Sequence, residues 1–257
     1  MILKVDNLVK KYGDLIAVNN ISFEITDGEI FGLLGPNGAG KTTTLKCILG
    51  LRKNDSGNIH INGKIAYLPE KKELYKRYTI EKMIEITNST TYNFSKEKAY
   101  NLINEFKLDK KTKISNLSHG MLTQLYIALT LAQDADLYIL DEPTWGLDPI
   151  MRNNILDLIR ELTYNGKSVL YTSHILSEVE KIADRIAIMS KGIILENDYL
   201  DDIKKKYSAI TLPKNKKING YLWKKLENEN VWIVKNKDGE KVTIDDIFEA
   251  IVKGEWE

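Results

Sequence analysis

The sequence predicts an α/β fold built around a parallel β-sheet. Strand-like apolar runs alternate with segments of helical spacing between residues 30 and 189. A glycine-rich octet at 35–42 stands between one such strand and one helix, and an acidic pair, Asp141-Glu142, directly follows another apolar run. Because parallel strands need crossover connections, usually helices, this alternation indicates a parallel sheet with right-handed crossovers.

The elements can be placed along the chain from hydrophobic periodicity and turn residues. Strands are expected at 2–5 and 22–25 around a turn at 12–14, at 30–34, in a 59–61/65–68 hairpin turning at Asn62-Gly63, at 137–140, 168–172, 185–189 and 231–234. Helices are expected at 43–49, over 79–107 with a break at 90–95, and at 120–133, 150–164, 175–183 and 244–252. We expect one main domain over 1–207, containing a helical subdomain at about 70–135, and a small α+β appendage over 208–257.

Composition excludes several classes of protein. Lys and Arg total 37 against 36 Asp and Glu, and the net charge of +1 argues against a general affinity for nucleic acid. A single cysteine, Cys47, permits no intramolecular disulfide, and three histidines with one cysteine do not make a typical structural zinc site. The first residues lack a charged segment followed by a long apolar stretch, so we expect no signal peptide, and no apolar run reaches 18 residues. We therefore expect a cytoplasmic protein whose membrane role would require a partner.

Residues 35–42, Gly-Pro-Asn-Gly-Ala-Gly-Lys-Thr, match the phosphate-binding loop G-x-x-x-x-G-K-[ST] in full. Its glycines let successive backbone N–H groups turn inward, and the helix that follows adds the positive end of its dipole. Lys41 can reach the β- and γ-phosphates of a nucleotide, and the Thr42 hydroxyl can bind Mg²⁺. The residues expected to hold the nucleotide are Gly35, Pro36, Asn37, Gly38, Ala39, Gly40, Lys41, Thr42 and Thr43.

Asp141 and Glu142 stand where the strand at 137–140 ends. Ligands of parallel sheets collect at the carboxyl ends of strands. Adjacent residues of an extended strand point to opposite faces, so the two carboxylates can divide the work. We expect Asp141 to bind Mg²⁺ and Glu142 to polarise the attacking water.

Three further motifs occur in a fixed order around this pair: Leu117-Ser118-His119-Gly120, Trp145-Gly-Leu-Asp148-Pro149, and Thr172-Ser173-His174. With the phosphate loop, this order resembles the nucleotide-binding subunits of ATP-binding cassette (ABC) transporters, over roughly residues 2–200. The segments Tyr92-Asn-Phe94 and 244–248, with Glu70, make it most similar to the ABC-2-type exporter branch, which handles drugs and antibiotic peptides. The resemblance implies a P-loop NTPase core of ABC ATPase type with an antiparallel β subdomain.

The resemblance also implies roles for single residues. Tyr12 corresponds to the aromatic residue that stacks on adenine, and His174 to the histidine that senses the γ-phosphate. Leu117, Ser118, His119 and Gly120 form the signature that contacts ATP held by the opposite subunit. Asp148 couples the two sites of a dimer, and Glu70 stands at the usual glutamine position, beside Mg²⁺. Lys41, Glu142 and His174 are therefore the expected catalytic residues.

The implied activity is ATP hydrolysis with Mg²⁺, in an ATP-dependent dimer with a second copy or a paralogue. The implied partner is an integral membrane permease, gripped by the helical region 70–116 at the inner face of the cell membrane. Departures from the family pattern lie at His119, Glu70 and Trp145, and the helix after Gly120 lacks the common arginine. If the backbone at His119 must be left-handed, the histidine would be strained there; if not, its ring could donate a hydrogen bond to phosphate. We therefore expect the ATP-dependent closure of the dimer to be weaker or sensitive to pH.

Three other interpretations stay open. A soluble ABC ATPase of DNA repair or translation would carry long coiled-coil insertions or tandem cassettes, and the sequence has one cassette and no sustained heptads. A weakly hydrolysing regulatory module is supported only by the His119 and Trp145 departures. A P-loop kinase would need an acceptor site and would lack the signature.

Overall fold

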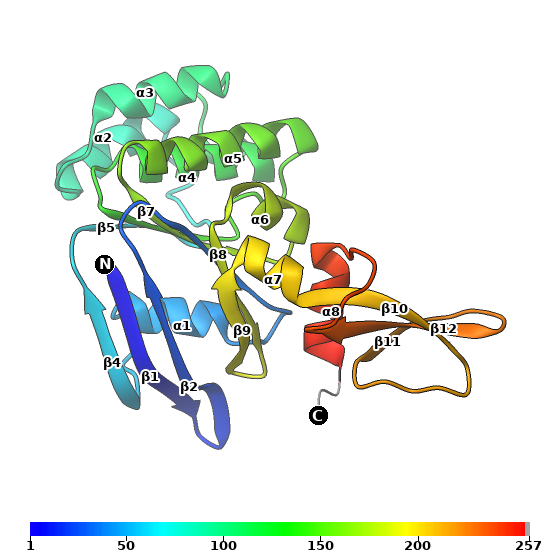
Figure 1. Ribbon diagram of the computed structural model, residues 1–257. Coiled ribbons are helices and arrows are strands. Elements are labelled where there is room, and N and C mark those ends of the chain that lie inside the picture. Colours follow the sequence, from blue (N-terminus) through cyan, green and yellow to red (C-terminus); the bar gives the residue numbers. More distant parts are fainter. Residues whose placement is uncertain (255–257) are drawn as a thin grey trace. The chain divides into compact units, whose positions relative to one another are not determined.

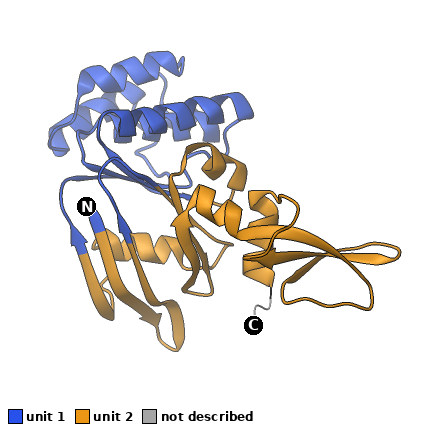
Figure 2. Ribbon diagram, viewed as in Figure 1, with its two compact units in different colours: residues 1–3, 24–30, 60–172 blue, residues 4–23, 31–59, 173–257 orange. Residues whose placement is uncertain are grey.

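The computed structural model describes residues 1–254. This part of the chain forms two compact units, each discontinuous in sequence (Figure 2). Unit 1 comprises residues 1–3, 24–30 and 60–172, and unit 2 comprises residues 4–23, 31–59 and the described chain from 173 onward. The domain boundary expected at residue 207 remains a prediction.

Unit 1 combines three parallel strands with helices (Figure 1). Its elements are β5 (Ile65–Leu68), α2 (Ile80–Thr90), α3 (Lys96–Glu105), the 3₁₀ turn η1 (Ile114–Asn116), α4 (His119–Leu131), β6 (Leu137–Asp141), α5 (Pro149–Tyr164) and β7 (Ser168–Ser173), whose last residue belongs to unit 2. The strand order is β5-β6-β7, and all of β6 is buried, as its apolar sequence predicts for a strand covered on both faces. The register places Asp141 beside Thr172.

The predicted hairpin of 59–61 and 65–68 is wrong. β4 (Ser56–Ile61) joins an antiparallel sheet of order β2-β1-β4, whereas β5 pairs in parallel with β6. The intervening turn is held instead by Asp136, whose carboxylate accepts from the Lys64 N–H over 2.8 Å. A non-local pairing has therefore overridden a local turn signal.

Unit 2 holds most of the antiparallel sheet and the remaining elements (Figure 1). They are β1 (Leu3–Tyr12), β2 (Leu15–Ile25), β3 (Ile30–Leu34), α1 (Lys41–Ile48), α6 (Leu176–Ile182), β8 (Arg185–Ser190), β9 (Ile193–Tyr199), α7 (Leu200–Lys206), β10 (Tyr207–Pro213), β11 (Tyr221–Lys225), β12 (Glu229–Lys235) and α8 (Ile244–Lys253). β3 runs parallel to β8, and β9 is antiparallel to β8. We call residues 207–254 the C-terminal segment. Its sheet consists of the antiparallel strands β10-β12-β11.

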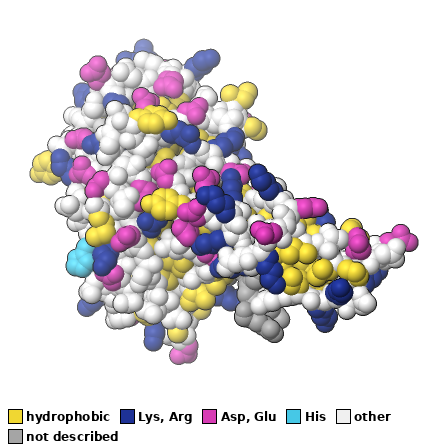
Figure 3. Space-filling view, viewed as in Figure 1, with side chains coloured by type: hydrophobic (Ala, Val, Ile, Leu, Met, Phe, Trp, Pro, Cys, Tyr) yellow, Lys and Arg dark blue, Asp and Glu magenta, His cyan; other side chains and the backbone are white. Residues whose placement is uncertain are grey.

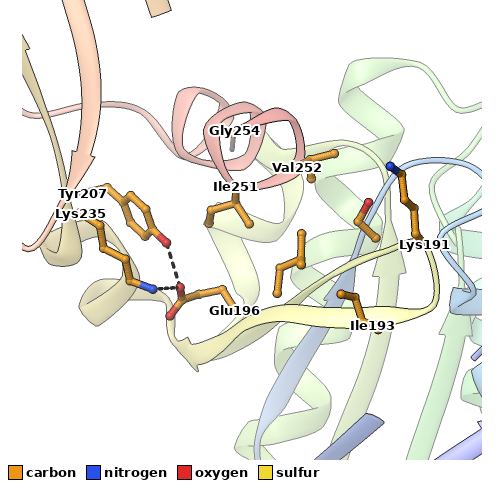
Figure 4. Close-up of a pocket in the computed structure, with 10 residues that line it drawn as sticks. Lys191, Ile193, Glu196, Tyr207, Lys235, Ile251, Val252 and Gly254 are labelled. Atoms are coloured by element: carbon orange, nitrogen blue, oxygen red, sulfur yellow. Dashed lines mark hydrogen bonds and ion pairs between the residues drawn. The ribbon is translucent and has the colours of Figure 1, made fainter. Parts of the chain in front are cut away.

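The C-terminal segment packs on the β8–β9 hairpin around one buried carboxylate, Glu196 (Figure 4). Its oxygens accept hydrogen bonds from Lys206 Nζ at 3.0 Å, Lys235 Nζ at 2.6 Å and Tyr207 Oη at 2.8 Å. A cavity of about 420 Å³ lies beside this cluster. Its lining residues come from β8, β9 and the C-terminal segment: Ser190, Lys191, Ile193, Leu195, Glu196, Tyr207, Lys235, Ile251, Val252 and Gly254.

Charged side chains of both signs are interspersed over the face of the molecule drawn in Figure 3. This distribution matches the nearly equal numbers of basic and acidic residues. In residues 1–254, no helix has both the length and the apolar character needed to cross a bilayer.

Candidate active site

In unit 2 the phosphate loop joins β3 to α1. α1 begins at Lys41, two residues before the predicted start, and Gly40 is its N-cap in a left-handed conformation. Lys41 is buried and donates to the carbonyl oxygens of Gly35 at 2.6 Å and Pro36 at 3.3 Å. The ammonium group is thus folded back onto the loop, while Asn37 and Gly38 are exposed at its tip.

The loop is braced by the turn between β8 and β9. The Gly192 N–H donates to the Ala39 carbonyl over 2.9 Å, and the Asn19 N–H donates to the Gly192 carbonyl over 2.8 Å. Thr42 and Thr43 lie half-exposed in the first turn of α1, and the Thr44 hydroxyl donates to the Gly40 carbonyl. The helix start therefore keeps backbone N–H groups and hydroxyls available for an anion.

Two other predicted residues belong to unit 2. Tyr12 ends β1, is 44% exposed, and has the Lys10 ammonium 5.4 Å from its ring centroid. An exposed ring of this kind can stack on a flat ligand. His174 is exposed and directly follows β7.

In unit 1, Asp141 and Glu142 are both buried at the end of β6. The Thr172 hydroxyl donates to Asp141 Oδ1 over 2.6 Å and accepts from the Glu142 N–H over 3.1 Å. Glu142 has φ of +50°, a left-handed conformation that costs a non-glycine residue roughly 1–3 kcal/mol unless neighbours hold it. Thr172, for which the sequence predicted no role, therefore contacts the Asp141 carboxylate and the Glu142 backbone.

Positive charge and burial mark the surroundings of this pair. Burial lowers the pKa of Lys72, against the opposing influence of Asp141, Glu70 and Glu142, and its ammonium donates to the Glu70 carbonyl over 3.3 Å. Burial, together with Asp141 and Glu70, raises the pKa of Tyr67 to about 12. Lys72 was not predicted as a site residue, because a lysine in a run of charged residues carries no local signal.

The signature residues begin α4. Ser118 is the N-cap and its hydroxyl accepts from the Met121 N–H over 3.2 Å. His119 is the first helical residue, so its backbone is right-handed and the strain considered for this position does not arise. Leu117 precedes the cap, and Gly120 lies half-exposed in the first turn.

Asp148 caps α5, accepting from the N–H groups of Ile150 and Met151, each over 3.0 Å. Pro149 at the first helical position completes a standard helix start. The predicted site residues of unit 1 are Glu70, Asp141, Glu142, Asp148 and the signature Leu117–Gly120. The phosphate loop, Tyr12 and His174 belong to unit 2.

Metal binding can be judged from the donors that are present. Within residues 1–254, His, Cys, Asp and Glu side chains form no group of three or more that could hold a metal ion. Carboxylate and hydroxyl oxygens, as in Asp141 and Thr42, are nonetheless the hard donors that Mg²⁺ uses when phosphates supply its other ligands. By its chemistry, each of these two donors suits a metal that arrives with a nucleotide.

Comparison with known proteins agrees with this chemistry. The family model described as "ABC transporter" matches residues 18–145. An uncharacterized ABC transporter ATP-binding protein of Methanocaldococcus jannaschii is 36% identical over 84% of both chains. The linearmycin resistance ATP-binding protein LnrL of Bacillus subtilis is 38% identical over 74% of this chain and 67% of its own. The lantibiotic transport ATP-binding protein SrtF of Streptococcus pyogenes is 37% identical over 77% of this chain and 91% of its own.

Solved structures show the same fold. The ATP-binding subunit of an ABC transporter superposes with a TM-score of 0.74 at 30% identity, over 80% of this chain and 92% of that one. A dimeric ATP-binding cassette bound to ADP and Pi gives a TM-score of 0.70 at 24% identity, over 77% and 98% of the two chains. By sequence, by fold and by the order of its motifs, this protein belongs to the ABC transporter ATP-binding family.

Proposed function

We propose that this chain is the ATP-hydrolysing subunit of an exporter, and that it acts on a separate membrane permease. The observation that carries the proposal is the buried Asp141-Glu142 pair held by Thr172 at the end of β6, in a chain that also has a complete phosphate loop. Relatives named for linearmycin resistance, lantibiotic transport and Nod factor export support the exporter branch.

Nucleotide binding is assigned to the phosphate loop, residues 35–43, with Tyr12 stacking on the base. Lys41 would exchange its two carbonyl acceptors for the β- and γ-phosphates, since a charge-assisted bond to phosphate is stronger than one to a neutral carbonyl. Thr42, Asp141 and Glu70 are the proposed Mg²⁺ ligands. A bound Mg²⁺ would supply positive charge that neutralises the phosphates during transfer of the γ-phosphoryl group to water, with ADP as the leaving group.

Hydrolysis is assigned to Glu142 and His174. Glu142 accepts a proton from the attacking water as general base, and its burial keeps bulk solvent from competing for that role. His174 donates to the γ-phosphate and helps to place the water.

The proposed working form is a head-to-tail dimer with a second copy or a paralogue. Each ATP would lie between the phosphate loop of one subunit and the segment Leu117–Gly120 of the other, and Asp148 would couple the two sites. ATP stabilises the closed dimer because it binds that state better than the open one, and hydrolysis removes the difference. The region 70–116 would transmit the motion to the permease, at the inner face of the cell membrane.

The Glu142→Gln variant tests this proposal. It keeps the phosphate loop intact and removes the base, so we expect ATP binding to persist while phosphate release falls at least about 100-fold. Light scattering at saturating Mg-ATP should then detect accumulated dimer. A parent protein that binds ATP without steady phosphate release would instead favour a regulatory module, and a monomeric variant would contradict the dimer.

A further inference from the structure

Two departures from the family pattern, His119 and Trp145, contact each other in the structure. Their ring centroids are 4.6 Å apart and the ring planes meet at 85°, an edge-to-face arrangement. His119 begins α4, whereas Trp145 lies in the loop between β6 and α5. Both residues lie in unit 1, so one subunit supplies the whole contact.

Gly146 also lies close to the His119 ring. A Cβ atom placed on Gly146 would lie 2.4 Å from His119 Nδ1, closer than any real contact permits. Gly146 also has φ of +80°, which favours glycine on its own account. The histidine ring thus occupies the space that a side chain at Gly146 would need, and it also contacts Trp145.

The loop that contains Trp145 and Gly146 begins at Glu142, the proposed general base. The Trp145 N–H donates to the Glu142 carbonyl over 3.3 Å, which closes a turn, and the Leu147 N–H donates to the Thr144 carbonyl over 3.1 Å. Glu142 itself has the left-handed conformation described above. Thr172 holds its N–H, and Trp145 holds its carbonyl.

Trp145 is 51% exposed, so its surroundings cover only about half of it. An exposed aromatic ring in a loop samples several rotamers unless a neighbour restricts it. The ring of His119 is placed to do this. It stands on a helix whose first turn is fixed by the Ser118 cap.

We propose that His119 is a positioning residue for hydrolysis, whose ring holds Trp145 and Gly146 so that Glu142 keeps its left-handed conformation. This inference rests on the proposed role of Glu142 as general base. It assigns the histidine side chain to its own subunit, in place of a direct contact with the nucleotide of the opposite subunit. The two assignments predict different kinetics.

The test compares His119→Gly, His119→Phe and Trp145→Ala, with His60→Gly as a matched control at an exposed histidine on β4. We expect His119→Gly to lower kcat by about two- to tenfold, the value of an aromatic pair, with KM for ATP within about twofold of the parent. His119→Phe keeps a ring that can meet Trp145 and should restore most of kcat. Trp145→Ala should add nothing further in the His119→Gly background.

Three outcomes would overturn the proposal. His119→Gly could raise KM with unchanged kcat, which would place the ring on the nucleotide, or His119→Phe could be as slow as His119→Gly. The third is a double variant, His119→Gly with Trp145→Ala, in which the losses of kcat from the two single variants add in full. A parent without ATPase activity would refute the proposed function instead. In that case tryptophan fluorescence without nucleotide still tests the ring contact. Subtracting the emission spectrum of the Trp145→Phe counterpart from that of each protein isolates the emission of Trp145. His119→Gly should change that difference spectrum and His60→Gly should not, and an unchanged spectrum would also reject the contact.

Discussion

The Thr172 hydroxyl donates a hydrogen bond of 2.6 Å to the Asp141 carboxylate from the neighbouring parallel strand. The same oxygen accepts from the Glu142 N–H over 3.1 Å. Thr172 is fully buried, so neither bond is exchanged easily for one to water. A single side chain thus fixes the positions of two residues that the proposed reaction assigns to metal binding and proton transfer.

Thr172→Val should therefore cost stability and activity together. The substitution keeps the side-chain volume but removes one hydrogen bond to the buried Asp141 carboxylate and one from the Glu142 N–H, which keeps its bond to the Thr172 carbonyl at 3.3 Å. A hydrogen bond to a charged group contributes about 1.5–3 kcal/mol, so we expect a loss of that order in urea denaturation, with a lower kcat. Thr90→Val, which removes an exposed hydroxyl bonded within α2, is the matched control and should change stability by less than about 0.5 kcal/mol. Equal stability of the two variants would contradict the anchoring role.

Two glycines of the phosphate loop should respond differently to alanine, although both have positive φ. A Cβ at Gly40, with φ of +109°, would lie 2.5 Å from the Ala17 carbonyl oxygen, whereas one at Gly38, with φ of +80°, meets nothing within 4 Å. Gly38→Ala should cost about 1–2 kcal/mol, the price of a left-handed alanine. Gly40→Ala should cost about 1–3 kcal/mol more, because strand β2 must move away.

Thermal unfolding without nucleotide measures this difference directly, and calorimetric titration with ATP then reports what remains of the loop. We expect Gly38→Ala to retain measurable ATP binding and Gly40→Ala to lose most of it. If Gly40→Ala were as stable as Gly38→Ala, the close approach of β2 to the phosphate loop would be wrong.

Much of the site could be predicted because its signals are local. The phosphate loop is fixed by eight adjacent residues, and the strand ending at Asp141 by one apolar run. The caps at Ser118 and Asp148 follow from residue types next to helix starts. These features need no knowledge of which strand lies beside which.

What could not be predicted depends on distant pairings. β5 leaves its expected hairpin for β6, whose residues follow some 70 positions later. β9, with the sequence Ile-Ile-Leu-Glu-Asn-Asp-Tyr, lacks a clear alternation and was not expected as a strand; it is specified by pairing with β8. The contact of His119 with Trp145 likewise joins a helix position to a loop position far away in sequence, and no spacing rule connects the two.

Glu196 offers a test of how the C-terminal segment is held. Burial alone would raise the pKa of its carboxyl, but hydrogen bonds from Lys235, Lys206 and Tyr207 outweigh burial and bring the pKa below its ordinary value of 4.5. The folded-state pKa is thus lower than the unfolded one. The group therefore contributes stability that is fully present above pH 4.5 and is lost as the pH falls through the folded-state value.

Glu196→Gln should accordingly destabilise the protein at neutral pH by about 1–3 kcal/mol, since it removes the charged partner of Lys235 and one of the two carboxylates, Glu196 and Asp198, that bind Lys206. The difference from the parent should shrink as urea denaturation is repeated at falling pH below 4.5, and it should be smallest below the folded-state pKa, where the carboxylate of the folded parent is protonated as well. Glu180→Gln is the matched control: its ion pair with Lys204, at 2.7 Å, is partly exposed to solvent and should contribute less than about 1 kcal/mol. A difference between Glu196→Gln and the parent that stayed constant across this pH range would mean that the glutamate acts through packing alone, and that its charge does not hold the C-terminal segment on the β8–β9 hairpin.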